Sequence, residues 1–183
     1  MSNSIFSINT WDTASSYSTH DIVHSGGRFY YAKKNLDDTN EIVVNDVNAN
    51  TSTSWGGYLI HPITLKVYPF FFWRPSYQTQ ANFEPKVSVV KYGDGYEKRI
   101  SEQINTSLLI LDLKFEGLTT SEATAILHFL HVRAAKSAFI YKPSEPFTVS
   151  DSDAKLFVCR KWSSSNTFFN NHTVQASFEE VPA

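Results

Sequence analysis

The side chains that could catalyse a reaction are few and poorly placed for it. Glu179 and Glu180 come nearest to a carboxylate pair, but neighbouring residues on a strand project from opposite faces and cannot share a substrate. Cys159, the single cysteine, falls inside a predicted strand, where we expect a reduced packing residue and no nucleophile. The sequence has no Gly-x-Ser-x-Gly elbow and no His-Glu-x-x-His motif. It therefore predicts a protein that is not an enzyme.

Metal and cofactor sites are not indicated either. His128 and His131 are three residues apart on a predicted helix, but no third ligand follows them, so we expect surface histidines and no metal. The Asp- and Asn-rich segment 37–54 lacks the ligand spacing and closing Glu of an EF-hand, which favours a solvated loop. Gly93-Asp94-Gly95 lacks the spacing of a nucleotide-binding loop. No cofactor is predicted.

Composition narrows the class of partner. The chain has 183 residues, 42% of them hydrophobic and 15% aromatic, which suffices for one domain or a small pair with a buried core. Its formal net charge is −2 and no segment is a dense Lys/Arg block, so we expect no nucleic-acid specificity. The longest apolar run, 69–73, is too short for membrane insertion, and the first residues lack the pattern of a signal peptide. The partner is expected to be protein or sugar.

The segment 87–99 holds the most specific local pattern. Residues 87–92 alternate as in a short strand, and two glycines one residue apart then supply the positive φ that a tight reversal needs. Asp94 can accept hydrogen bonds from amides of the turn. We therefore predict a hairpin with a structural turn at Gly93, Asp94 and Gly95.

A regular series of elements surrounds this hairpin. Phe70, Phe71, Phe72 and Trp73 form an aromatic block that is either a core strand or, if exposed, an oligomer interface. Alternation predicts strands over 104–115, 138–141, 156–162 and 174–181, with Leu156, Val158, Arg160 and Trp162 on one face of the third. Thr119 and Glu122 have capping-box spacing, and an apolar stripe follows, which predicts one helix over about 120–136.

The order of these motifs resembles the minor tail protein M family of lambda-like phages over about residues 70–183. The segments that carry the resemblance are 91–99 (KYGDGYEKR), 109–113 (LILDL), the helix 120–135, 136–143 (KSAFIYKP), 157–163 (FVCRKWS) and 175–181 (QASFEEV). This family forms the distal ring between tail tube and tip. The resemblance implies a mainly β fold, a tail-tube-like sandwich or barrel with one packed helix.

The same resemblance implies a structural virion protein. Its expected partners are further copies of itself in a hexameric ring, the tail tube protein, and the hub or tip proteins below. Its expected location is the virion tail tip, after assembly in the host cytoplasm. The candidate residues for the oligomer or partner interface are Phe70, Phe71, Phe72, Trp73, Tyr92, Tyr96 and Arg99.

Residues 1–58 read as a small added β module, followed by a linker and first strand over 59–69 and the main domain over 70–183. Ile22–His24 and Arg28–Ala32 flank Gly26-Gly27, a hairpin pattern. Over about 6–58 an ordered set of residues resembles the pattern of carbohydrate-binding modules of the chitin-binding type, with departures at His20 and at Lys34-Asn35. The set is Trp11, Tyr17, Asp21, Val23, Gly27, Tyr30, Ala32, Lys33 and Trp55-Gly56. This leaves a second hypothesis, attachment to a host surface glycan. Its candidate sugar-stacking residues, which core packing would explain equally well, are Trp11, Tyr30 and Trp55.

Overall fold

The computed structural model describes residues 6, 8–37, 54–61, 64–76, 79–83, 87–93, 95–101, 108–143 and 155–182. They form a mainly β protein with one helix, as predicted, and no closed barrel is found among these residues. The elements are β1 (Asn9–Thr10), β2 (Ile22–Ser25), β3 (Arg28–Ala32), β4 (Trp55–Gly56), β5 (Tyr58–Ile60), β6 (Val67–Phe71), β7 (Gln80–Phe83), β8 (Val87–Lys91), β9 (Glu97–Ser101), β10 (Leu109–Leu118), α1 (Thr120–Arg133), β11 (Phe139–Tyr141), β12 (Lys155–Phe168) and β13 (Asn171–Val181).

The largest sheet has the strand order β5-β6-β11-β12-β13-β10-β7. Its long strands β12, β13 and β10 are antiparallel neighbours, whereas β11 runs parallel to β6. In β10, Leu109, Leu111 and Leu113 are buried while Asp112 is exposed, so one face of the sheet meets the core and the other meets solvent. The predicted alternation of this strand is confirmed.

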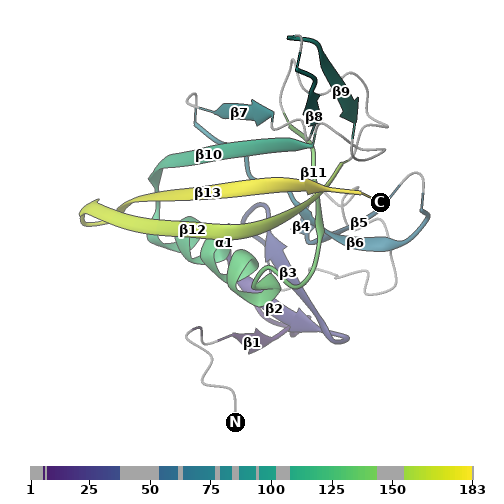
Figure 1. Cartoon of the computed structure of the whole chain (residues 1–183). Helices are drawn as coiled ribbons and strands as arrows, with labels where there is room; N and C mark the ends of the chain where they lie inside the picture. The colour runs from purple at the N-terminus through teal and green to yellow at the C-terminus, as the bar shows by residue number, and fades with distance from the viewer. Residues whose placement is uncertain are drawn as a thin grey trace.

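Helix α1 covers the apolar face of this sheet, beneath β12 and β13 in Figure 1. It begins where predicted, because the Thr119 side chain accepts a hydrogen bond from the Glu122 backbone N–H as N-cap. It ends earlier than predicted, at Arg133, because Ala134 takes a left-handed conformation that closes the last turn. Ile126, Phe129 and other helix residues pack with the sheet in one hydrophobic core.

A second, four-stranded sheet of order β1-β2-β3-β4 lies against the other side of α1. Its hairpin of β2 and β3 turns at Gly26-Gly27, as predicted. Val23, Tyr30 and Trp55 form a small core of their own, but Tyr31, the neighbour of Tyr30, points the opposite way and joins the main core beside Trp73 and Phe129. The helix is thus packed between two sheets.

This arrangement corrects one prediction about histidines. His131 is exposed as expected, but His128 is only 2% exposed and was wrongly expected at the surface. The reason is long-range: the small sheet covers the side of the helix where His128 lies, and the Phe29 and Tyr31 rings contact its imidazole. No local pattern in the helix sequence marks this second buried side.

A β-bulge corrects a second prediction, in β12. Cys159 pairs with Phe178 and Lys161 with Ser177, so an extra residue is inserted between Cys159 and Lys161. The bulge moves Trp162 to the face that packs against the main core, away from the face predicted for it with Leu156 and Val158. Alternation alone assigns the wrong face to every residue beyond such an insertion.

Candidate functional site

The three candidate sugar-stacking residues lie together in and around the small core of the four-stranded sheet. Tyr30 and Trp55 are each 1% exposed, and Trp11 is partly buried against the same cluster. The Tyr17 ring packs edge-on against Trp55 at a centroid distance of 5.3 Å. A sugar platform needs an exposed aromatic face. The packing of Tyr30 and Trp55 therefore argues against this use of them.

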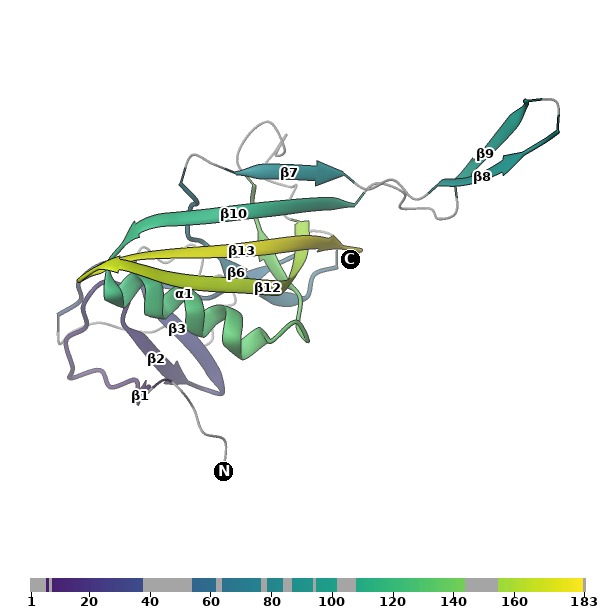
Figure 2. The same cartoon turned by 60° about the vertical axis from the view of Figure 1, so that its left-hand side comes forward.

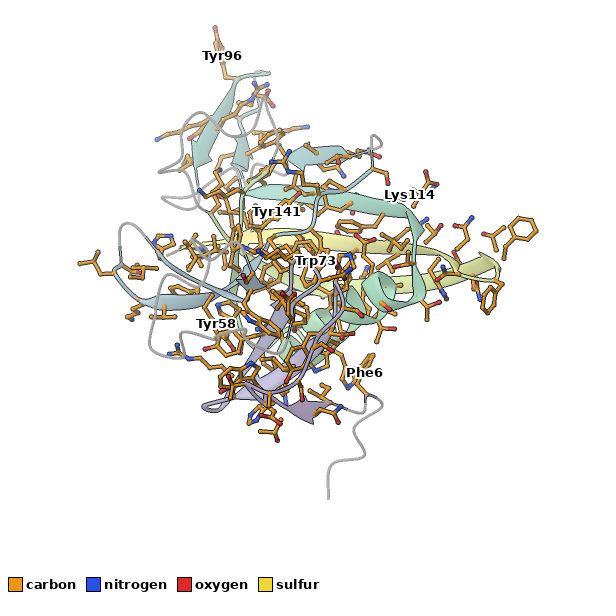
Figure 3. All side chains as sticks on the ribbon, turned by 180° about the vertical axis from the view of Figure 1, so that it is seen from behind. Phe6, Tyr58, Trp73, Tyr96, Lys114 and Tyr141 are labelled. Carbon is orange, nitrogen blue, oxygen red and sulfur yellow. The ribbon has the colours of Figure 1, made fainter. Side chains whose placement is uncertain are left out.

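The aromatic block at 70–73 lies in the core. This agrees with its interpretation as a core strand, the alternative being an exposed oligomer interface. Phe70, Phe71 and Trp73 are buried, and Phe72 is partly buried and stacked on Trp73 at 4.1 Å between ring centroids. Figure 3 shows Trp73 and Tyr141 inside the body of the molecule. These rings hold α1, β6 and β13 together. They therefore stabilise the fold on which any interface depends.

The hairpin of β8 and β9 stands apart from both sheets. It forms a two-stranded sheet of its own and projects from the body beyond the end of β10 (Figure 2). Val90 pairs with Lys98 and Ser88 with Ile100, so these four residues share one face. Continuing the alternation places Tyr92 and Tyr96 on this face as well. An isolated two-stranded hairpin is at best marginally stable in water, so contact with another surface would stabilise this one.

Exposure on the hairpin is unusual for its residue types. Tyr96 is 76% and Tyr92 55% exposed, and Val90 and Ile100 also face solvent. Figure 3 shows Tyr96 extending outward from the far end of the molecule. We call Val90, Tyr92, Tyr96 and Ile100 the apolar hairpin face. Aromatic and β-branched side chains gathered on an exposed surface mark an interaction site.

The opposite face of the hairpin is mostly charged. Val89 lies there opposite Arg99, and Lys91 lies opposite Glu97. The Arg99 guanidinium pairs with the Glu97 carboxylate along the same strand. Arg99, one of the predicted interface residues, thus belongs to the water-facing side, whereas Tyr92 and Tyr96 belong to the apolar side.

The turn of this hairpin has the geometry that the two glycines permit. The Tyr92 N–H donates to the Tyr96 carbonyl at 2.7 Å, and the Gly95 N–H donates to the Tyr92 carbonyl at 3.2 Å. Gly95 has φ of +81°, a conformation that residues with a Cβ rarely adopt. Asp94 lies outside the described residues. The turn sets the two tyrosines beside each other at the distal end of the hairpin.

Sequence reasoning missed a second exposed aromatic group. Phe168 and Phe169 lie at the turn between β12 and β13 and are 71% and 99% exposed. The available signal was the pair of phenylalanines directly before Asn170-Asn171, a turn sequence within an uncharged stretch. Because the predicted strand ended at Trp162, both phenylalanines fell outside every predicted strand and helix.

Several polar side chains pair with one another on the polar face of the large sheet. Arg160 donates to Glu179 at 2.7 Å, Asn82 donates to Asp112 at 3.0 Å, and a shallow cavity of about 390 Å³ lies over this face between β7 and β12. Within the described residues no three His, Cys, Asp or Glu side chains gather as metal ligands. The part of the chain that is described contains no helix long and apolar enough to cross a membrane.

Cys159 is buried, and its environment suppresses its reactivity. Burial raises the pKa of the thiol to about 12, although hydrogen bonds to the backbone oppose this shift. The thiol donates to the Lys161 carbonyl at 3.3 Å. A thiol that stays protonated at neutral pH is a poor nucleophile. Its position beside Phe178 is that of a packing residue.

Comparison with known protein families identifies a match. Residues 69–182 match the model of a family described as phage minor tail protein. The matched segment begins in β6 and ends after β13, so it includes the helix, the projecting hairpin and the large sheet except β5 and the start of β6. A search of curated proteins finds no match to the chain.

Proposed function

The chain belongs to the phage minor tail protein family, and we propose that it is the subunit of a ring at the distal end of the tail. Its role as a structural component of a phage tail follows from the family. The finer assignment is a homo-oligomeric ring, a hexamer by resemblance to the M family of lambda-like phages. The ring joins the tail tube above to the hub and tip proteins below.

The apolar hairpin face is the observation that carries this proposal. Val90, Tyr92, Tyr96 and Ile100 are exposed on a hairpin that belongs to neither of the larger sheets. Both strands also leave one edge of backbone groups without a strand partner among the described residues. A protein that works alone would expose such a hairpin to aggregation, whereas an assembly covers it with a neighbouring subunit.

The division of the chain is part of the same proposal. Residues 70–183 form the ring domain, 59–69 are the linker and first strand, and 1–58 form an added module at the periphery. The small sheet packs on the outer side of α1, away from the polar face of the large sheet, which supports a peripheral position. Such a protein needs no catalytic group, and its partners are other tail components.

The native mass of the purified chain tests the ring. We expect light scattering across a concentration series to show a species several times the 20.8 kDa chain mass, and electron microscopy of it to show closed rings. Replacing both Tyr92 and Tyr96 by Ser should shift the mass toward the monomer, because each ring loses most of its buried apolar area.

A matched control separates this effect from a general loss of apolar surface. Val132 is an exposed apolar residue on α1, remote from the hairpin in sequence and outside the proposed interface. Val132→Ser should leave the mass unchanged. A wild-type chain that remains a monomer at every concentration, or a double tyrosine variant that assembles as wild type does, contradicts the proposal.

A further inference from the structure

The turn between β12 and β13 presents two phenylalanines at the end of the large sheet. Phe168 closes β12 and is 71% exposed, and Phe169 follows it at 99%. We call this pair the Phe tip. Burying a side chain as large as phenylalanine away from water is strongly favourable. Two such side chains, exposed at the end of a hairpin, form a surface suited to contact with a partner.

The Phe tip is held rigidly by the first turn of α1. Asn170, at φ of +55°, accepts a hydrogen bond from the Thr120 N–H through its side-chain oxygen at 2.8 Å. The Thr120 hydroxyl lies 3.1 Å from Nε2 of His172. Both bonds hold the backbone just after the two phenylalanines against the start of α1. A preorganised turn binds at a lower entropic cost than a mobile one.

The strands that carry the Phe tip have features of an interface. From Trp162 to Phe178 the sequence has no Lys, Arg, Asp or Glu. In β12, pairing with β11 involves Lys155–Phe157, so beyond Phe157 the described strands leave one edge of β12 unpaired. Edge strands are normally protected by charge or proline. Arg160 and Lys161 protect the start of this edge, but beyond Lys161 it carries no charge and ends in aromatic residues, which suits that part to burial against another chain.

The Phe tip and the apolar hairpin face lie at opposite ends of the molecule. Figure 2 shows the turn between β12 and β13 at one end of the long strands and the hairpin of β8 and β9 beyond the other. Two different surfaces at opposite ends can give a head-to-tail contact, which repeats from copy to copy and closes into a ring where the rotation between copies permits.

We propose that the Phe tip of one copy packs against the apolar hairpin face of the next copy. This inference rests on the proposed ring and names the two surfaces that build it. Phe168 and Phe169 would lie against Tyr92, Tyr96 and Val90, as aromatic pairs that stabilise beyond their buried area. Lys98 shares the apolar hairpin face with Val90, and its cation can lie over a phenylalanine ring.

The surroundings of the Phe tip favour this partner over a lipid surface. Bacterial membranes are anionic, and proteins that bind them place lysine or arginine near the inserted residues. The stretch from Trp162 to Phe178 contains neither, and the nearest ionisable side chain within it is His172. A surface that lacks charge but has exposed backbone edges fits a strand-rich protein partner, and the hairpin of a second copy supplies one.

Disulfide trapping between two single-cysteine variants tests the contact. Phe169→Cys and Tyr96→Cys chains are purified separately, mixed, and oxidised with copper phenanthroline. Wild type provides the blank, because Cys159 is buried and stays unreactive. We expect a covalent dimer from the mixture and a ladder of higher multimers from one chain that carries both substitutions. Each single variant alone should give neither.

A second pair serves as the matched control. Leu65 is 76% exposed, as Tyr96 is, but belongs to neither surface. Phe169→Cys mixed with Leu65→Cys should not cross-link. Strong cross-linking of this pair would mean random collision and would overturn the specific contact.

The outcomes separate the inference from the proposed function. Rings that form without a 96–169 cross-link keep the ring and overturn this contact. A chain that is monomeric throughout the concentration series overturns both. Binding of the wild-type chain to vesicles of phosphatidylethanolamine and phosphatidylglycerol, lost on Phe168→Ser with Phe169→Ser while the native mass stays unchanged, assigns the Phe tip to lipid and also overturns the contact.

Discussion

The hydroxyl group of Tyr31 and Nδ1 of His128 lie 3.1 Å apart in a buried hydrogen bond that joins the small sheet to α1. The two residues are far apart in sequence, and the bond sits among the rings of Phe29, Phe129 and Trp73. Burial raises the pKa of the Tyr31 hydroxyl, so it remains protonated at neutral pH. This contact makes the added sheet and the tail domain share one core.

Tyr31→Phe should destabilise the whole protein. The substitution keeps the ring but leaves the imidazole of His128 buried without this partner, at a cost of about 1–2 kcal/mol. Chemical denaturation followed by tryptophan fluorescence would show a lower midpoint with an unchanged slope. Tyr96→Phe is the control, because its hydroxyl is exposed on the hairpin. Equal stability of the Tyr31→Phe chain and wild type would show that the bond adds nothing.

Acid should weaken the protein through His128. Burial is the main reason that the pKa of this imidazole falls from 6.5 to about 4, and Arg133 adds to the effect. Between these values the unfolded chain binds a proton that the folded chain does not, so the free energy of unfolding falls as pH decreases. The slope is at most about 1.4 kcal/mol per pH unit.

His128→Gln isolates this contribution, since glutamine retains a polar side chain that does not titrate. Unfolding curves measured between pH 4 and 7 should be flatter for this variant than for wild type. Parallel slopes for wild type and His128→Gln would contradict the assignment.

Cys159 should resist thiol reagents in the folded protein. Because burial raises its pKa to about 12, the reactive thiolate is scarce at neutral pH. Reaction with Ellman's reagent should be slow in buffer and become rapid and stoichiometric in denaturant. Rapid labelling of the native chain would mean that β12 opens readily around the bulge.

Gly95→Val should impair assembly more than it impairs folding. At φ of +81° a side chain costs about 1–2 kcal/mol, and a β-branched one more, but the hairpin stands apart from the main core. We expect a modest change in unfolding and a clear loss of the multimer in light scattering. Gly93→Ala is the matched control, because Gly93 has neither a positive φ nor atoms within 4 Å of an added Cβ. Normal assembly of Gly95→Val would contradict the importance of the turn.

Asn170→Gly should loosen the Phe tip. Glycine tolerates the positive φ but removes the oxygen that accepts from the Thr120 N–H, so about 1 kcal/mol of stability is lost. Hydrogen exchange should speed up at Thr120 and in the turn, and the multimer should dissociate at higher protein concentration than wild type does. Unchanged exchange at Thr120 would show that the side chain does not hold the tip.

Local signals in the sequence were sufficient for local structure. The Thr119 cap, the Gly26-Gly27 turn and the alternation of β10 all appear where predicted, because each depends on residues within a few positions of one another. The bulge before Lys161 depends on how β12 meets β13, and it moved Trp162 to the other face. The burial of His128 depends on a sheet formed some hundred residues earlier. Neither the bulge nor the burial of His128 produces a periodic pattern in the sequence.

The candidate site also contains features that local sequence predicts and features that depend on tertiary structure. The hairpin with Tyr92 and Tyr96 could be predicted from alternation and glycine placement, whereas the exposure of Phe168 and Phe169 depends on where a long strand ends. The sequence of the block 70–73 was compatible with core or interface. Only the packing of α1 against β6 decides that Phe71 and Trp73 are buried.

The placement of α1 between two sheets has a consequence for how such a gene can be recombined. An exchange at the proposed boundary would replace the small sheet and keep the segment that matches the family model. Here Tyr31 fills the same core as Phe71, Trp73 and Phe129, so a cut near residue 58 would leave a hole in the recipient. A replacement module must supply an aromatic ring at the position of Tyr31, which limits the donors to close relatives.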